Sequence, residues 1–162
     1  MTAQRRRHSG WTVIPFIVVC FAAGGIGSLF MGADTWTWYR GLTQPAVTPP
    51  GWLFGPVWSA LYLMMGIAAW LVWRRGPAPG VGAALVLFAA QLVLNAIWTP
   101  VFFGLQNPGG ALVIIGLLWL AIVATTVVFW RQSRAAGVLL IPYLLWVSFA
   151  TYLNYSIATL NP

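Results

Sequence analysis

The sequence predicts an all-α membrane protein, a single bundle of five transmembrane helices that encloses a cavity. Of its 162 residues, 60% are hydrophobic and only 6% are charged, and the mean hydropathy is +0.85. A soluble globular domain is about a quarter charged, so this chain lacks the polar residues to cover a surface in water. Five apolar segments reach the roughly 20 residues that a helix needs to cross a bilayer.

Short stretches rich in Pro, Gly and Arg separate the five apolar segments, and such stretches are typical of turns. The chain shows no internal repeat and no soluble region, so we expect one transmembrane domain over residues 1–162. The predicted spans cover about residues 11–32, 52–73, 81–103, 111–130 and 137–158.

The first span contains small residues spaced four apart, which lets helix backbones approach closely. Three pairs have this spacing: Ala23 with Gly27, Gly24 with Ser28, and Ser28 with Gly32. We expect them to pack inside the bundle, and a homodimer seam is the alternative. The basic start of this segment also resembles a signal peptide, but the apolar run is longer than in a typical cleaved signal.

The second span follows a proline-rich stretch, QPAVTPPG, which we expect to form a semi-rigid lid over one end of the bundle. Trp58 and Tyr62 lie one helical turn apart in this span. They therefore share a face of the helix.

The third span contains QLVLNAIWTPVFFG, which places two amides, Gln91 and Asn95, one turn apart in the hydrocarbon region. An amide there is costly unless it has a partner. We expect Gln91 to link helices and Asn95, on the face of Trp98, to contact a ligand, with interhelical hydrogen bonding as the alternative. Pro100 should bend or end the helix because it lacks a backbone donor.

The fourth span follows the turn QNPGG, and the fifth follows RQSR. In the fifth span, Tyr143, Trp146, Ala150 and Asn154 lie along one stripe. We expect Trp146 to line the cavity. For Tyr143 and Asn154 we expect core packing and hydrogen bonds between helices.

The eight basic residues are all arginine, and they are distributed unevenly between the two sides of the membrane. Seven fall on the side of the N-terminus: Arg5, Arg6, Arg7, Arg74, Arg75, Arg131 and Arg134. Only Arg40 falls on the other side. This bias predicts a cytoplasmic N-terminus and suggests a bacterial cytoplasmic membrane.

The other ionisable residues are few enough to exclude whole classes of function. With one acid, Asp34, and one His, the chain cannot build a carboxylate pair, a Ser-His-Asp triad or an oxygen-rich metal site. We therefore expect no metal and no resident cofactor. The arginines are too dispersed for a nucleic-acid interface.

The eleven tryptophans include three that the helical stripes bring toward one space: Trp58, Trp98 and Trp146. Aromatic walls from three helices, with Asn95 and Tyr62 as hydrogen-bonding groups, suit a large, flat, mostly apolar ligand with a few polar handles.

Together, the motifs PVWSALY, QLVLNAIW and PYLLW, in this order, resemble the TspO/MBR family of tryptophan-rich sensory proteins, also called translocator proteins or peripheral-type benzodiazepine receptors. The resemblance implies five helices around a ligand cavity beneath the first inter-helix loop. It implies binding of porphyrins such as protoporphyrin IX and haem, of isoquinoline or benzodiazepine-type ligands and, in some members, of sterols. It also implies a homodimer.

The ligand-contacting residues that the resemblance implies are Tyr39, Phe54, Trp58, Tyr62, Asn95, Trp98, Phe102, Trp146 and Ala150. Some members of the family are reported to degrade protoporphyrin IX in light, and the tryptophans responsible would correspond to Trp58 and Trp146.

The chain departs from the family pattern at positions that matter for ligand choice. Ala46 and Val47 stand where relatives have tryptophans in the first loop, which thins the expected aromatic lid. Thr159 stands after Tyr155 where many relatives have Arg, so the cholesterol-recognition pattern is incomplete. This pattern is weak even when complete, so the sequence does not predict sterol binding.

A membrane tetrapyrrole-binding sensory or regulatory protein is the function expected from these observations. A light- and oxygen-dependent protoporphyrin-degrading enzyme is one alternative, and a porphyrin or sterol transporter is another. Active transport is disfavoured because the spans show no inverted repeat and no ionisable residue that would couple a gradient.

Overall fold

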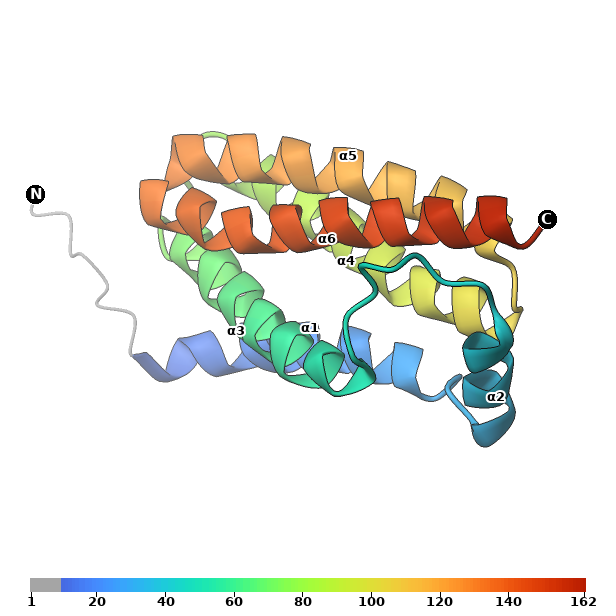
Figure 1. Cartoon of the computed structure of the whole chain (residues 1–162). Helices are drawn as coiled ribbons and strands as arrows, with labels where there is room; N and C mark the ends of the chain where they lie inside the picture. The colour runs from blue at the N-terminus through green and yellow to red at the C-terminus, as the bar shows by residue number, and fades with distance from the viewer. Residues whose placement is uncertain (1–9) are drawn as a thin grey trace, which may run out of the picture.

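A computed structural model describes residues 10–162 as a bundle of helices (Figure 1). The element order is η1 (Gly10–Val13), α1 (Ile14–Ser28), α2 (Ala33–Gly41), η2 (Gly51–Leu53), α3 (Phe54–Trp73), α4 (Val81–Thr99), η3 (Pro100–Gly104), α5 (Pro108–Gln132) and α6 (Arg134–Leu160). The described part of the chain contains no strand, so the predicted all-α fold is confirmed.

Five helical segments are long and apolar enough to cross a membrane, and they correspond to the five predicted spans. They cover Gly10–Ser28, Gly51–Trp73, Val81–Gly104, Pro108–Gln132 and Arg134–Leu160. Each ends within a few residues of its predicted limits, because glycine, proline and arginine mark the turns. The chain is therefore a multi-pass integral membrane protein.

The long helices are arranged as a closed ring. Helix α1 packs against α3 and α4, α4 against α5, α5 against α6, and α6 against α3. Figure 1 shows α5 and α6 side by side along one edge and α1 along the opposite edge. A ring of five helices leaves space in its middle wherever the side chains do not fill it.

Helix α2, which lies between the first span and the proline-rich segment, was not predicted. It lies at the end of the bundle that also holds the C-terminus (Figure 1). Asp34 occupies its first turn and Arg40 its last turn, which complements the helix dipole. This end of the bundle is called the α2 end below.

At the opposite end, called the arginine end, the helices are in close contact. An added Cβ at Gly66 of α3 would lie 2.7 Å from the Cα of Ile17 in α1. Ala68, Ala69 and Val72 are fully buried beside it. Side chains and backbone fill this end of the ring.

The small residues of α1 divide between packing and open positions. Ala23 is buried, and an added Cβ at Gly27 would lie 2.9 Å from Thr99 of α4. Ala23 and Gly27 therefore pack inside the bundle, as predicted. Ser28 is exposed, and an added Cβ at Gly32 would meet nothing within 4 Å, so their pair does not join two helices of the ring.

The third span continues beyond Pro100. Helix α4 ends at Thr99, and η3 is a π-helical turn in which the Leu105 N–H donates to the Pro100 carbonyl at 2.9 Å. π-Turns are rare and occur mostly as single turns within helices, and both they and prolines mark places where a helix departs from regular geometry. The η3 turn places Phe102 in a buried position, 2% exposed, below α2.

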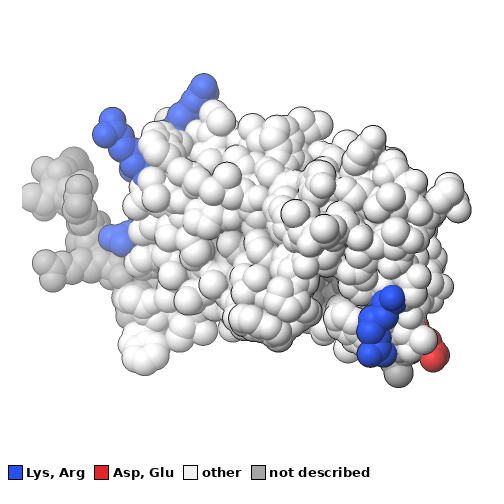
Figure 2. Space-filling model, viewed as in Figure 1, with Lys and Arg blue, Asp and Glu red and all other residues white. Residues whose placement is uncertain are grey.

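The described arginines are concentrated at the arginine end, where α3 and α5 end and α6 begins: Arg74, Arg75, Arg131 and Arg134. Arg40 and Asp34 lie at the α2 end. Figure 2 shows the blue side chains at both ends and the red one at a single end. Arg5, Arg6 and Arg7 lie outside the described residues.

Candidate functional site

A cavity of about 1050 Å³ occupies the middle of the ring at the α2 end. Its walls come from α1, α3, α4, η3, α5 and α6, and its cover comes from α2 and residues 44–51. Its volume is at the top of the roughly 300–1,000 Å³ that is usual for small-molecule sites. The space can therefore accept a large ligand.

Flat aromatic rings form much of the wall. Trp58 stacks on Tyr62 within α3, with ring centroids 5.4 Å apart and planes at 27°. Trp98 stacks on Phe102, with centroids 5.2 Å apart and planes at 30°. These spacings are typical of offset stacking, which fixes the direction each ring faces.

A third aromatic surface comes from α6 and α3. Trp146 meets Phe54 edge-on, with centroids 5.8 Å apart and planes at 72°. Ala150 lies one turn after Trp146 and also lines the cavity. A small residue beside the indole leaves room for a ligand against it.

A chain of hydrogen bonds runs from the cavity wall into the core. The Tyr62 hydroxyl donates to Asn95 Oδ1 at 2.9 Å, and Asn95 Nδ2 donates to the Tyr143 hydroxyl at 3.1 Å. The Tyr143 hydroxyl in turn donates to Gln91 Oε1 at 2.8 Å. In each bond the residue nearer Tyr62 is the donor. Together the three bonds link α3, α4 and α6.

The far end of this polar chain is incomplete. Gln91 is 1% exposed, and its Nε2 has no hydrogen-bond partner among the described residues. Gln91 links helices, as expected. Asn95, predicted to contact a ligand, lines the cavity but also uses both ends of its amide to connect α3 and α6.

A second polar contact holds Trp98. Its Nε1 donates to Asn154 Oδ1 at 3.0 Å, and Asn154 Nδ2 donates to the Pro108 carbonyl at 2.8 Å. Asn154 is 1% exposed and acts as the expected interhelical link. Because the indole N–H is engaged, the Trp98 ring has a defined orientation at the cavity wall.

The cover of the cavity is fastened to the end of α6. The Thr43 N–H donates to Asn161 Oδ1 at 2.9 Å, and Asn161 Nδ2 donates to the Thr43 carbonyl at 3.0 Å. Gln44 Nε2 donates to the Tyr39 carbonyl at 2.9 Å. The segment after α2 is thus tied both to the C-terminal end of the bundle and to α2.

Only one charged side chain, Arg40, lines the cavity among the described residues. Tyr39 also lines it, and partial burial raises the pKa of the Tyr39 phenol above its ordinary value of 10. Tyr39 therefore stays protonated at neutral pH and can donate a hydrogen bond. The cavity is apolar with one cation and a few neutral donors at its cover.

Comparison with known proteins agrees with this architecture. Residues 16–160 match the TspO/MBR family. The chain is 47% identical over 150 residues to the tryptophan-rich protein TspO of Chlorobaculum tepidum, covering 90% of this chain and 93% of that protein. The chain belongs to the TspO/MBR family.

The family relationship extends to proteins with other names. The chain is 38% identical to the protein CrtK of Rhodobacter capsulatus, covering 91% of each chain. It is 41% identical to the human translocator protein over 150 residues, covering 91% of this chain and 86% of that protein.

All nine residues that the TspO/MBR resemblance implied line this cavity: Tyr39, Phe54, Trp58, Tyr62, Asn95, Trp98, Phe102, Trp146 and Ala150. Sequence reasoning did not identify the apolar wall from α5, Ile115 and Leu118. No signal marks these two residues, because Ile and Leu recur throughout a span.

Ala46 and Val47, where the family resemblance implied tryptophans, lie away from the cavity. Ala46 and Val47 are exposed at the tip of a turn in which the Thr48 N–H donates to the Pro45 carbonyl at 3.0 Å. The cavity is lined instead by Gln44 and Thr48 on either side of that turn. The expected thinning of the lid therefore affects its outer surface.

Proposed function

We propose that this chain is a membrane protein that binds tetrapyrroles such as protoporphyrin IX and acts in sensing or regulation. The observation that carries the proposal is the cavity of about 1050 Å³ whose walls include aromatic rings from three helices, two pairs of them stacked and one pair edge-on. A flat macrocycle presents two large apolar faces to such walls, and ring-to-ring contacts contribute roughly 0.5–1.5 kcal/mol each beyond burial.

The polar groups of the cavity suit the rest of a porphyrin. Its two propionates lie at one edge of the ring, and Arg40 is the cation of the cavity cover. The neutral phenol of Tyr39 supplies a donor near it. We infer that the propionates face α2, where a charged edge remains near water, while the macrocycle lies among Trp58, Trp98 and Trp146.

The names of relatives support a sensory role. The chain is 38% identical over 148 residues to the tryptophan-rich sensory protein of Cereibacter sphaeroides. We carry that description over as part of the proposal. The isoquinoline or benzodiazepine-type ligands that the family resemblance implies would use the same aromatic walls.

Titration of the purified protein with protoporphyrin IX tests the proposal. We expect Trp58→Ala and Trp146→Ala to weaken binding at least about tenfold, a loss of roughly 1.4 kcal/mol each. Trp130→Ala is the control, because Trp130 packs on Gly137 at the arginine end. Equal losses in all three variants, or no binding by the unaltered protein, would contradict the proposal.

Illuminating the same samples separates binding from the alternative, light- and oxygen-dependent degradation. The observation that favours the alternative is that Trp58 lies at the cavity wall in ring contact with both Tyr62 and Tyr143. Degradation predicts a new absorbing product that is lost in Trp58→Phe. Bleaching at the rate seen without protein would leave binding as the function.

The arginine distribution supports a cytoplasmic location for the arginine end and a bacterial cytoplasmic membrane. Arg74 and Arg75 follow α3, and Arg131 and Arg134 lie on either side of the short connection between α5 and α6, so all four are near the span ends that the positive-inside rule counts. In this orientation, the α2 end and the cavity cover face the opposite side of the membrane.

A further inference from the structure

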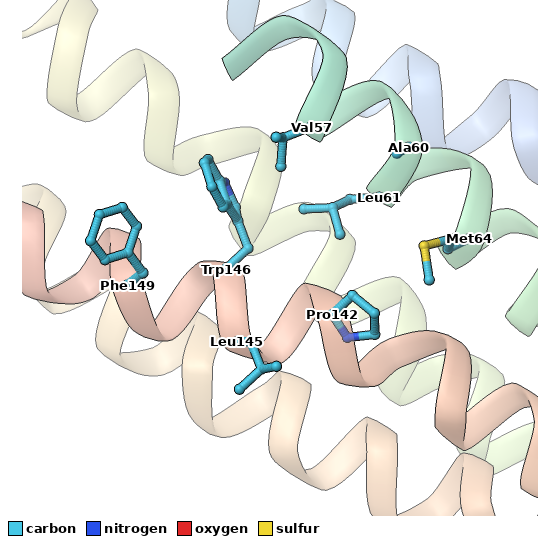
Figure 3. A pocket seen from close by; sticks show the side chains of 8 residues that line it. All are labelled: Val57, Ala60, Leu61, Met64, Pro142, Leu145, Trp146 and Phe149. Carbon is cyan, nitrogen blue, oxygen red and sulfur yellow. The ribbon is translucent and has the colours of Figure 1, made fainter. Parts of the chain in front are cut away.

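A second hollow lies on the outside of the ring, between α3 and α6. This groove has a volume of about 470 Å³ and is lined by eight residues, all apolar and all labelled in Figure 3. It lies in the membrane-crossing part of both helices. The groove therefore faces the hydrocarbon core of the bilayer, where only apolar molecules dissolve.

One side chain borders both the groove and the inner cavity. Of the described residues, Trp146 alone lines both spaces. Figure 3 shows its ring projecting from α6 toward Val57 of α3. The two hollows would become one passage if this ring moved aside.

The Trp146 ring is held less firmly than the ring of Trp98. The Nε1 of Trp146 is buried and has no hydrogen-bond partner among the described residues, whereas Trp98 Nε1 donates to Asn154. A buried donor without a partner costs roughly 1–3 kcal/mol. No hydrogen bond from the indole therefore opposes rotation of Trp146, and rotation that reaches a partner would recover this cost.

The backbone beneath Trp146 is also weakened. Pro142 lies one turn before Trp146, inside α6, and itself lines the groove. A proline within a helix removes one backbone hydrogen bond and favours local bending at that turn. The missing bond is the one to the Val138 carbonyl, so the helix can bend in the turn just before the one that carries the Trp146 ring.

The cover over the α2 end of the cavity is held more firmly than the Trp146 side chain. The segment after α2 covers the cavity and is tied to α6 by the two hydrogen bonds between Thr43 and Asn161. These bonds hold the cover in place over this end of the cavity. An apolar ligand concentrates in the bilayer, so the groove also offers it the more populated starting point.

We propose that Trp146 is a gate through which apolar ligands dissolved in the bilayer enter the cavity from the groove between α3 and α6. The inference rests on the proposed function for the identity of the ligand, a flat porphyrin whose apolar macrocycle would pass Trp146 from the bilayer while its charged propionates stay at the membrane surface. It adds a second role for Trp146, whose inner side lines the binding cavity and whose outer side closes the groove.

Filling the groove tests this route without altering the cavity. Ala60 is exposed, lines the groove and does not line the cavity, so Ala60→Phe obstructs the path alone. The matched control is Leu63→Phe, on the same helix, because Leu63 is 44% exposed and lines neither space. Both variants are compared with the unaltered protein in phosphatidylcholine vesicles, by stopped-flow fluorescence of protoporphyrin IX.

We expect Ala60→Phe to slow association and dissociation alike, by roughly fivefold or more, while Kd stays within about twofold, because a gate sets rates and not the bound state. Leu63→Phe should match the unaltered protein. Equal rates in Ala60→Phe and Leu63→Phe would overturn the proposal. Should Ala60→Phe not fold, as judged by its thermal melt, Ala60→Leu takes its place.

A second measurement tests the entry route through the groove independently of the proposed function. In vesicles with brominated acyl chains, bromine in the groove should quench Trp146, so Trp146→Phe should remove a quenched component of the emission. Ala60→Phe should protect that component, whereas Leu63→Phe should not. If Trp146 is not quenched, the route through the groove is overturned, whether or not protoporphyrin binds. If Trp146 is quenched but protoporphyrin does not bind, the result counts only against the proposed function.

Discussion

The two ends of the bundle are assembled from different kinds of contact. At the arginine end, backbones and small residues meet directly, as at Gly66 against Ile17, and Phe88 stacks on Phe129 with centroids 5.6 Å apart. At the α2 end, aromatic rings hold the helices apart around a cavity of about 1050 Å³. The first arrangement has little room to adjust, and the second leaves space that a ligand can fill.

This difference suggests that stability and binding are separated along the membrane normal. Within a bilayer, helix association depends on close packing because the lipid tails are as apolar as the helix surfaces. The arginine end supplies that packing. The α2 end can therefore remain hollow without loss of the ring, and substitutions at the two ends should affect different measurements.

The largest effect is expected at Gly66. An added Cβ in Gly66→Ala would meet the backbone of Ile17, which cannot move aside as a side chain would. We expect the free energy of unfolding to fall by roughly 1–3 kcal/mol, as for other overpacked sites. Thermal denaturation in detergent measures it, and protoporphyrin affinity of the folded fraction should be unchanged.

Gly116→Ala is the matched control for Gly66→Ala. Gly116 lies within α5, and an added Cβ there would meet nothing within 4 Å. Replacing a helical glycine by alanine under these conditions is worth roughly 0.5–1 kcal/mol in the stabilising direction. If both variants changed stability in the same direction, close packing would not be what distinguishes the arginine end.

A smaller change in stability, with a change in binding, is expected at Gly24. An added Cβ in Gly24→Ala would contact the Tyr62 ring, a side chain that can rotate away and so break its hydrogen bond to Asn95. Interhelical hydrogen bonds in membranes average about 0.6 kcal/mol, so the loss of stability should be below that at Gly66. We expect weaker protoporphyrin binding in a fluorescence titration, since Tyr62 lines the cavity. Unchanged affinity would show that the Tyr62 position is not needed for binding.

The smallest effect is expected where the cavity cover meets α6. Asn161→Ala removes both hydrogen bonds to Thr43, each worth about 1 kcal/mol, without touching the core. We expect global stability to stay nearly constant while the Thr43 amide exchanges its hydrogen faster, roughly tenfold, in deuterium-exchange measurements. Thr159→Ala is the control, because its hydroxyl bonds only to carbonyls of its own helix.

The spans could be predicted because hydropathy over some 20 residues is a property of the sequence alone. Helix α2 was missed because its mixed sequence, ADTWTWYRG, carries no clear apolar face, although Asp34 and Arg40 at its two ends were an available signal. The π-turn after Pro100 also had no signature, since a proline there is equally compatible with a simple helix end.

The polar residues show where sequence reasoning reaches its limit. Spacing placed Gln91 and Asn95 on one face of a helix, but it could not show that Tyr143, 48 residues beyond Asn95, joins them into one chain. Both amides therefore link helices, and Asn95 also lines the cavity. Partners from distant helices are fixed by the packing of the ring, which spacing within one helix does not determine.

The link between Thr43 and Asn161 has a practical consequence for handling the protein. Because Asn161 holds the cavity cover and Pro162 is its neighbour, a purification tag or fluorescent fusion joined to Pro162 would begin beside the cover. Such a fusion could strain the fastening and change ligand kinetics in a way that mimics a mutation. A tag at the N-terminal end, where α1 starts at the far side of the bundle (Figure 1), avoids this artefact.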